Sequence, residues 1–494
     1  MKSLDLVSEA KLQEAILNSR RAFMKDSAFG VGALALGQLL TGCTSPPTKG
    51  VPQSINRLAG DLPMFPGKAK RIIYMHMAGG PSHLELFDYK PALEKLDGQE
   101  CPPSLLEGKR FAFIRGVPKM LGPLGRFKKH GESGALVSHF LPHFADVVDD
   151  VTIIKSAFTD QFNHAPAQLL MQTGSAQLGR PSMGSWVTYG LGSENEDLPG
   201  FMVLTSGGNN PDGGKAMWGS GFLPSVYQGV HCRSEGDPVL FLSNPKGMSR
   251  SLRKASIDAI NAVNRESHQH FQDPEILTRI KQYEMAYRMQ IEVPGVLSID
   301  EEPPYIHDLY GSNPNTSSFA NNVLLARKMV ENGVRFVQLY DWGWDAHGTN
   351  ADSSLDRGFA DKCASIDRPI AALLKDLKQR GLLDETLVVW SGEFGRTPMQ
   401  ENRNGVDLPF KGRDHHPYAF TMWMAGGGMK KGFTFGETDE IGYYPIRDKV
   451  SVYDIQATIL HQLGFDHEKF TFPFQGRDFR LTDVEGHVVK DVLA

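Results

Sequence analysis

The amino-acid sequence predicts an α/β fold in which helices cover both faces of a central, mostly parallel sheet. Strand-like and helical segments alternate along the chain, which is the order of elements that builds a parallel sheet. The strands are continuous apolar runs, as is typical of strands buried on both faces. Polar clusters follow the strand ends, where sites form in open α/β sheets.

The strands are predicted from short apolar runs bounded by turn-forming residues. The first run ends in a glycine-rich turn at residues 78–81, and the second precedes the polar segment 163–166. The predicted strands cover residues 71–77, 151–156, 334–340, 386–390 and 418–424.

The helices are predicted from apolar residues at helical spacing and from stop signals. Pro166 lies near the first turn of one helix, where proline is tolerated, while Gly333 and Gly381 end two others. The predicted helices cover residues 165–172, 251–292, 318–332, 359–379 and 451–463.

The composition of the 494-residue chain indicates a folded protein with a large core, because 40% hydrophobic and 22% charged residues exclude disorder throughout. A net charge of −5 gives no electrostatic reason for nucleic-acid binding. Four cysteines without CxxC spacing argue against a zinc knuckle or a disulfide-dense scaffold.

The N-terminal segment reads as an export signal. Residues 19–25, SRRAFMK, match a twin-arginine signal, and the apolar stretch 28–40 is shorter than the roughly 20 residues of a membrane span. Residues 40–43, LTGC, resemble a lipoprotein cleavage box with Cys43 as the lipidated residue. We therefore expect export by the twin-arginine pathway, giving a periplasmic protein or a membrane-anchored lipoprotein with the lipid as its sole membrane contact.

This interpretation divides the chain into three parts. Residues 1–42 form the signal peptide, and residues 43–70 form a tether rich in Pro, Ser and Gly. Residues 71–494 form a single catalytic or binding domain.

Two polar clusters contain the residue types of a divalent-metal site. Asp345 and His347 follow the strand 334–340, and a carboxylate and an imidazole two residues apart can face one cation. His415 and His416 lie in the second cluster beside Asp414, which we expect to orient one imidazole. The sequence leaves open which of the two histidines ligates, and a solvated loop is the alternative for this cluster.

Other candidates follow the remaining strands. Glu393 is a candidate metal ligand, and Arg396 is a candidate for binding an oxyanion; the alternative is an ion pair between the two. His164 begins a helix, where an anion or a nucleophile is favoured, with a helix cap as the alternative. His83 and Asp88, after the first strand, are further candidate ligands.

The order of four motifs resembles domain-of-unknown-function family 1501 of the alkaline phosphatase/sulfatase superfamily. The motifs are GGPSH at residues 79–83, WDAH at 344–347, EFGRTP at 393–398 and GRDHHP at 412–417. The resemblance implies an alkaline-phosphatase-like domain with a central, mostly parallel sheet between helices and with sites at the carboxyl ends of the strands.

The chain departs from the superfamily pattern at three positions. The position of the nucleophile holds His164, glycines stand where the first strand usually ends in an aspartate, and Glu393-Phe394 replaces an Asp-His pair. The resemblance then implies one complete metal subsite, formed by Asp345, His347 and either His415 or His416. The other subsite retains Glu393, with His83 or His164 as a substitute ligand.

These residues support an exported, metal-dependent hydrolase that acts on phosphate or sulfate esters of small molecules or glycans. A divalent metal would activate water, with zinc as the first choice and calcium, manganese or iron as alternatives. Arg396 or Arg413 would bind the anion, and His164 would act as general acid/base or as nucleophile.

Two other functions are compatible with the sequence. The missing nucleophile favours a non-catalytic, envelope-tethered binding protein that retains the fold and one metal subsite. The export route alone suggests an extracytoplasmic redox protein, but the sequence has no CxxCH haem motif and no dinucleotide fingerprint.

Overall fold

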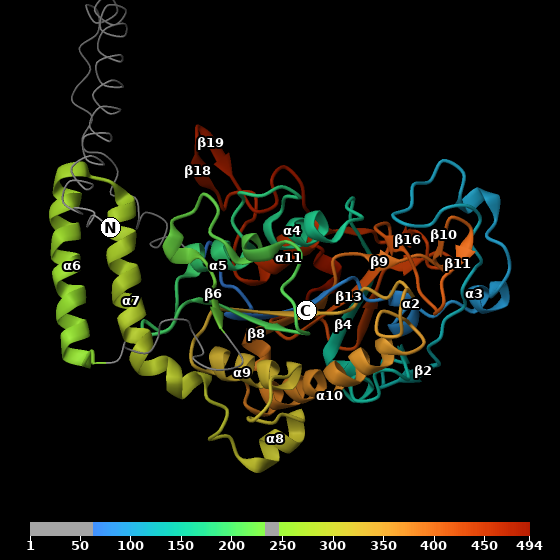
Figure 1. Ribbon diagram of the computed structural model, residues 1–494, viewed down its shortest axis with the longest axis horizontal. Coiled ribbons are helices and arrows are strands. Elements are labelled where there is room, and N and C mark those ends of the chain that lie inside the picture. Colours follow the sequence, from blue (N-terminus) through green and yellow to red (C-terminus); the bar gives the residue numbers. More distant parts are fainter. Residues whose placement is uncertain (1–62, 233–246) are drawn as a thin grey trace, which may run out of the picture. The chain divides into compact units, whose positions relative to one another are not determined.

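A nine-stranded sheet forms the centre of the fold in the computed structural model, which describes residues 63–232 and 247–494 (Figure 1). The strand order is β14-β4-β13-β8-β1-β7-β5-β6, and β17 pairs with β4. The strands are β1 (Arg71–Ala78), β4 (Val151–Phe158), β5 (Phe201–Ser206), β6 (Val230–Cys232), β7 (Phe336–Trp342), β8 (Thr386–Ser391), β13 (Phe420–Ala425), β14 (Phe433–Phe435) and β17 (Val450–Ser451). The predicted α/β fold with a mostly parallel sheet is confirmed.

One strand of this sheet runs against the others. The central strand β1 is parallel to both neighbours, β7 and β8, whereas β13 is antiparallel to β8 and to β4. The start of β13 therefore lies at the same edge of the sheet as the ends of β1, β7 and β8. Residues just before β13 can thus meet residues that follow the parallel strands.

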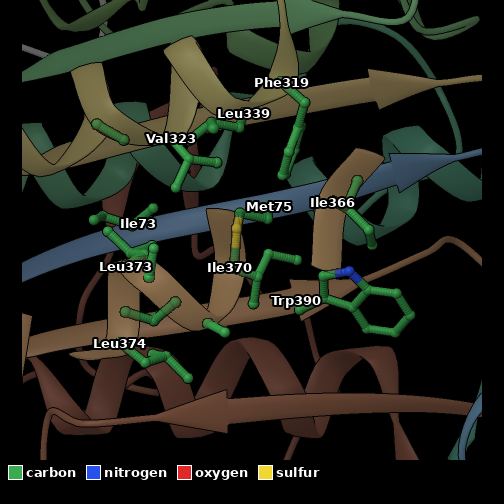
Figure 2. Packing of buried hydrophobic residues seen from close by; sticks show 14 of the residues in the cluster. Ile73, Met75, Phe319, Val323, Leu339, Ile366, Ile370, Leu373, Leu374 and Trp390 are labelled. Atoms are coloured by element: carbon green, nitrogen blue, oxygen red, sulfur yellow. The ribbon is translucent and has the colours of Figure 1, made fainter. Parts of the chain in front are cut away.

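Helices cover both faces of the sheet, because alternate residues of each strand point to opposite faces. Ile73 and Met75 of β1 pack in one apolar cluster with α9 and α10, and Ile72 and Tyr74 pack in another with α4, α5 and α11. Figure 2 shows the first cluster, in which Ile73 and Met75 lie among α9 and α10 side chains such as Val323. Both faces are thus buried, which explains the apolar runs in the sequence.

Each predicted helical segment is helical in the structure, whereas α5 and the short helices had not been predicted. The longer ones are α4 (His164–Thr173), α5 (Met183–Leu191), α6 (Arg250–Phe271), α7 (Pro274–Leu297), α9 (Phe319–Glu331), α10 (Gly358–Gln379) and α11 (Val452–Gln462). The predicted helical stretch 251–292 is two helices, α6 and α7. Short helices are α2 (His83–Leu86), α3 (Pro91–Leu96) and α8 (Pro304–Tyr310), and 3-10 turns span Pro103–Leu105, Phe144–Asp150, Gly214–Trp218, Ser225–Tyr227, Leu383–Glu385 and Lys490–Val492.

Five two-stranded ribbons complete the described part of the chain. They are β2 (Phe127–His130) with β3 (Ala135–Ser138), β9 (Gly395–Arg396) with β12 (His415–His416), β10 (Asn402–Arg403) with β11 (Val406–Asp407), β15 (Glu437–Thr438) with β16 (Pro445–Arg447), and β18 (Phe472–Phe474) with β19 (Arg477–Phe479). The ribbon of β9 and β12 joins two of the motifs found in the sequence.

The described end of the predicted tether is fixed to the domain. Met64 donates its backbone N–H to the carbonyl of Gly464 at 2.9 Å, and Ala69 donates to that of Gln462 at 2.8 Å. The predicted signal peptide, Cys43 and the tether up to residue 62 lie outside the described residues. Within the described ranges, no helix has the length and apolar character needed to cross a bilayer.

Candidate metal centre

Four side chains from three segments meet at the edge of the sheet. Asp345 and His347 follow the end of β7, His164 begins α4 shortly after β4, and His415 lies in β12 just before β13. Because β13 is antiparallel, its start brings His415 to the edge where β7 ends. One ligand atom from each of the four lies within 4.8 Å of all the others.

The three imidazoles direct Nε2 toward a single carboxylate oxygen. Asp345 Oδ1 lies 2.8 Å from His347 Nε2, 3.2 Å from His415 Nε2 and 3.3 Å from His164 Nε2. His164 Nε2 is buried, and its approach to Asp345 lacks hydrogen-bond geometry. It can therefore face a cation at the centre of the cluster once it carries no proton.

The outer nitrogen of each imidazole is held by an acceptor. Nδ1 of His164 lies 2.7 Å from Glu393 Oε1, and Nδ1 of His415 lies 2.8 Å from the carbonyl of Phe162. Nδ1 of His347 bonds the Glu401 carboxylate. Carbonyl and carboxylate oxygens only accept, so each Nδ1 donates its proton when the imidazole is neutral, leaving Nε2 deprotonated. This is the arrangement in which proteins hold metal-ligating histidines.

Glu393 fixes the orientation of His164. Its side chain is fully buried, and it accepts hydrogen bonds from Gly79 N (2.9 Å), Gly80 N (3.2 Å), Gln168 Nε2 (3.0 Å) and His164 Nδ1 (2.7 Å). Gly79 has a φ of +119°, and a Cβ there would lie 2.5 Å from the backbone nitrogen of Asp345. The structure thus places Glu393 as the partner of His164 and outside the four-residue cluster, contrary to its predicted place among the metal ligands.

Arg396 orients Asp345 and is itself enclosed. Its side chain is 1% exposed, and Nη2 lies 2.5 Å from Asp345 Oδ1. The other donors contact the carbonyls of Gly79, Gly80 and Arg413. Arg396 pairs with Asp345 and not with Glu393, the alternative that the sequence left open. Since four of its five N–H donors are engaged inside the protein and its side chain is enclosed, it is not placed to hold an oxyanion as predicted.

The side chain of Arg413 is fully buried and contacts residues outside the cluster. Its Nη2 forms an ion pair of 2.8 Å with Glu85, and both residues are fully buried. Its remaining contacts go to Glu85 again and to the carbonyls of Leu121, Thr397 and Gly122. These contacts use all five N–H donors of the guanidinium. The predicted role of Arg413 in anion binding therefore has no donor to support it.

The structure also separates the candidate histidines. His415 and His416 are neighbours in a strand, so their side chains point to opposite faces. His416 Nε2 bonds the carbonyl of Tyr443 at 2.6 Å, and His83 Nε2 bonds that of Gly442 at 3.1 Å. Of the two adjacent histidines the cluster contains His415, and neither His416 nor His83 belongs to a potential ligand group among the described residues.

The sequence matches, over residues 69–493, the family described as "Protein of unknown function (DUF1501)". The chain belongs to the DUF1501 family. The predicted family membership is thus confirmed. No curated protein matches the chain.

Several solved structures are similar to this DUF1501 chain. The PsFucS1 sulfatase from Pseudoalteromonas sp. is 12% identical, with 82% of this chain and 69% of that chain covered and a TM-score of 0.35. The phosphonate monoester hydrolase SpPMH from Silicibacter pomeroyi is 11% identical, with coverage of 86% and 76% and a TM-score of 0.34. Alkaline phosphatase from the Antarctic bacterium TAB5 is 11% identical, with coverage of 74% and 94% and a TM-score of 0.28.

Several residues around the candidate metal centre were not predicted from the sequence. Glu401 holds His347 and also forms a second potential ligand group with His347 and Asp414. Phe113 places its ring 4.9 Å from that of His347, and His76 of β1 lies 3.3 Å from Glu393. Glu401 lies three residues beyond the EFGRTP motif, and no spacing rule connects it with a histidine 54 positions earlier.

Two carboxylates, one predicted to orient an imidazole and one predicted as a ligand, have other partners. Asp414 accepts the backbone N–H groups of Phe113, Ile114 and His415, so it fixes backbone and does not orient an imidazole. Asp88 bonds the hydroxyl of Thr438 and lies outside the cluster.

The pKa values of the cluster show how its charges are balanced. Burial alone would lower the pKa of His164, but contacts with Asp345 and Glu393 outweigh burial and raise it to about 9. Burial, with the positive charges of Arg396 and His164, lowers the pKa of His415 to about 4. Burial would raise the pKa of the Asp345 carboxyl, but Arg396 and the imidazoles hold it well below its usual range. A proton on His164 therefore competes with a metal ion for this site.

Proposed function

We propose that this DUF1501 protein is a metal-dependent hydrolase of phosphate or sulfate esters, in which His164, Asp345, His347 and His415 hold one divalent metal. The observation that carries the proposal is the convergence of three Nε2 atoms on Asp345, each imidazole being oriented through Nδ1. Three imidazoles and one carboxylate suit zinc or iron better than calcium, which prefers oxygen ligands.

The site combines enclosure with access from solvent. His415 and His347 have side chains only 2% and 8% exposed, whereas Asp345 is 32% exposed and His164 18%. A bound divalent ion supplies Lewis acidity and lowers the pKa of a coordinated water. The chain contributes the enclosed walls and the fixed imidazoles, and the exposed side of Asp345 marks where an ester would enter.

His164 is a ligand in this proposal and not an acid/base group or nucleophile. Its Nδ1 is held by Glu393 and its Nε2 faces Asp345, so both nitrogens are committed. Ser82, the serine of the GGPSH motif, donates its hydroxyl to Glu85. We therefore propose direct attack by water, without a covalent enzyme intermediate.

A non-catalytic binding protein is the second candidate, and one observation favours it. Arg396 donates to Asp345 and Arg413 donates to Glu85, and both also donate to backbone carbonyls. No guanidinium of these two is left to stabilise charge that develops on a phosphoryl or sulfuryl group. Such a protein would bind the metal and an anionic ligand but turn nothing over.

The test is metal analysis of the purified full chain, followed by turnover of 4-nitrophenyl phosphate and 4-nitrophenyl sulfate. We expect about one zinc or iron per chain and turnover of at least one ester. His347→Ala should lose both, whereas His270→Ala, an exposed histidine of α6, should retain them. Metal without turnover of either ester would favour the binding protein, and absence of metal from freshly purified protein and after reloading would refute the site.

Metal affinity is expected to rise with pH between about 6.5 and 9. The proton that the raised pKa of about 9 keeps on His164 must leave before Nε2 can bind a metal. That proton stabilises the metal-free fold below pH 6.5, and the stabilisation is lost as pH rises through about 9. Melting temperatures with and without zinc should therefore diverge as pH increases, and a zinc-induced shift that shrinks over this range would contradict the prediction.

We also propose that residues 1–42 direct export by the twin-arginine pathway and that Cys43 receives a lipid. The support is the SRRAFMK and LTGC motifs and the apolar stretch between them. Replacing Arg20 and Arg21 by lysine should retain the protein in the cytoplasm. Export of this variant at the wild-type level would contradict the proposal.

A further inference from the structure

A basic cavity lies in the loop of residues 106–116. Its volume is about 420 Å³, and its lining residues are Leu106, Lys109, Arg110, Phe111, Ile114, Arg115 and Gly116. Three of these side chains carry positive charge and none carries negative charge. A concave surface of one sign concentrates ligands of the opposite sign.

Two of the three cations have no carboxylate partner within the described ranges 63–232 and 247–494. Lys109 lies over the ring of Tyr444 at 5.2 Å, and Arg110 lies over the ring of Phe162 at 5.9 Å. Arg115 instead folds back on its own loop and donates to the carbonyls of Phe111, Ala112 and Ile114. Arg115 therefore shapes the loop, while Lys109, which also bonds the Tyr444 hydroxyl, and Arg110 carry charges that no carboxylate of the described residues pairs.

The loop is joined directly to the candidate metal centre. The backbone N–H groups of Phe113 and Ile114 donate to Asp414 Oδ2 at 2.7 and 2.8 Å, and Asp414 Oδ1 accepts from the backbone N–H of His415 at 2.7 Å. Phe162, which lies under Arg110, gives its carbonyl to His415 Nδ1. Two cavity residues are thus each connected to His415 through one intermediate residue, Ile114 through Asp414 and Arg110 through Phe162.

The opposite end of the loop is also anchored. The backbone N–H of Arg115 donates to Asn402 Oδ1 at 3.3 Å, and its carbonyl accepts from Gly405 N at 2.9 Å. Arg403 of the same ribbon lies over the ring of Phe113 at 4.9 Å, and its charge is paired with Glu401 at 3.1 Å. Because the loop backbone is held on both sides, the exposed side chains of Lys109 and Arg110 start from a fixed backbone, which lowers the cost of binding.

We infer that Lys109 and Arg110 form a second anion site, which binds a further sulfate or phosphate group of the substrate while the metal centre holds the scissile ester. This inference rests on the proposed function and narrows it to substrates with more than one anionic group. The guanidinium of Arg110 offers paired N–H donors and Lys109 a point charge, and both recognise the oxygens that sulfate and phosphate share.

The test measures binding by calorimetry with two probes, inorganic tripolyphosphate and a short dextran sulfate, on the metal-loaded full chain. The double variant Lys109→Gln/Arg110→Gln should weaken binding of at least one probe about tenfold or more, and the probe that loses affinity identifies the anion. The matched control Lys128→Gln/Lys129→Gln removes the same charge from exposed positions of β2 and should change affinity less than about twofold. Equal losses in both double variants, or no binding of either probe to the wild type, would overturn the inference.

Failure of this inference can be told apart from failure of the proposed function. In His347→Ala, the dependence of probe binding on Lys109 and Arg110 should persist, because neither residue touches the imidazole. Conversely, Lys109→Gln/Arg110→Gln should lower turnover of an ester that carries a second sulfate more than turnover of the singly charged 4-nitrophenyl sulfate. Equal losses for the two esters would contradict a separate second site.

Discussion

Asp345→Asn is expected to abolish metal binding and, with it, any hydrolysis. The substitution removes the charged oxygen on which three imidazole Nε2 atoms converge. Loss of an outer hydrogen-bond partner of a ligand typically weakens metal affinity 10–100-fold. Loss of the central carboxylate should exceed that, so we expect affinity to fall more than about 100-fold.

The measurement is zinc affinity by competition with a chelator, together with the metal content of the purified variant. Asp384→Asn, which changes an exposed aspartate, provides the control and should behave as the wild type. Breaking a buried ion pair costs about 3–5 kcal/mol, but Asp345 is 32% exposed and Arg396 keeps three carbonyl partners, so the loss of stability should be smaller. A folded variant with unchanged zinc affinity would show that Asp345 only accepts hydrogen bonds from its neighbours.

Most of the fold could be predicted because its pattern is local. Both faces of β1 are buried, so nearly every residue from Ile72 to Ala78 is apolar. This apolar run is visible in the sequence without a structure. The direction of β13 could not be predicted, because an antiparallel strand buried on both faces has the same apolar run as a parallel one. That direction determines which residues meet at the site, since it places His415 at the edge of the sheet where β7 ends.

The residues of the four-residue cluster were among the predicted site residues, whereas most of the residues that hold them in place were not. Asp345 and His347 are two residues apart after a strand, and this spacing by itself indicates a shared ligand. The choice of His415 over His416 depends on which face of a two-residue strand points to the cluster. Residue spacing does not carry that information. The charge partners of Arg396 and Arg413 are Asp345 and Glu85, 51 and 328 positions away, so their enclosure is a property of the fold.

The buried pair of Arg413 and Glu85 is expected to have the largest effect on stability. Glu85→Gln leaves a guanidinium charge that is 0% exposed without its counter-charge. Removing one partner of such a pair typically costs about 3–5 kcal/mol of unfolding free energy. Chemical denaturation of the metal-loaded protein measures this loss. Asp258→Asn, which breaks the exposed pair with Lys254 by the same acid-to-amide change, should have a much smaller effect.

The same variant distinguishes a structural from a catalytic Arg413. If the guanidinium only fills its pocket, Glu85→Gln should lower stability while the folded protein keeps its zinc affinity and its KM for a singly charged ester. The double variant Glu85→Leu/Arg413→Met removes both charges, so it should cost less than the sum of the single changes, although the carbonyls of Leu121, Gly122 and Thr397 lose their donors. A selective rise in KM in Arg413→Met, with stability unchanged, would instead place Arg413 on the substrate.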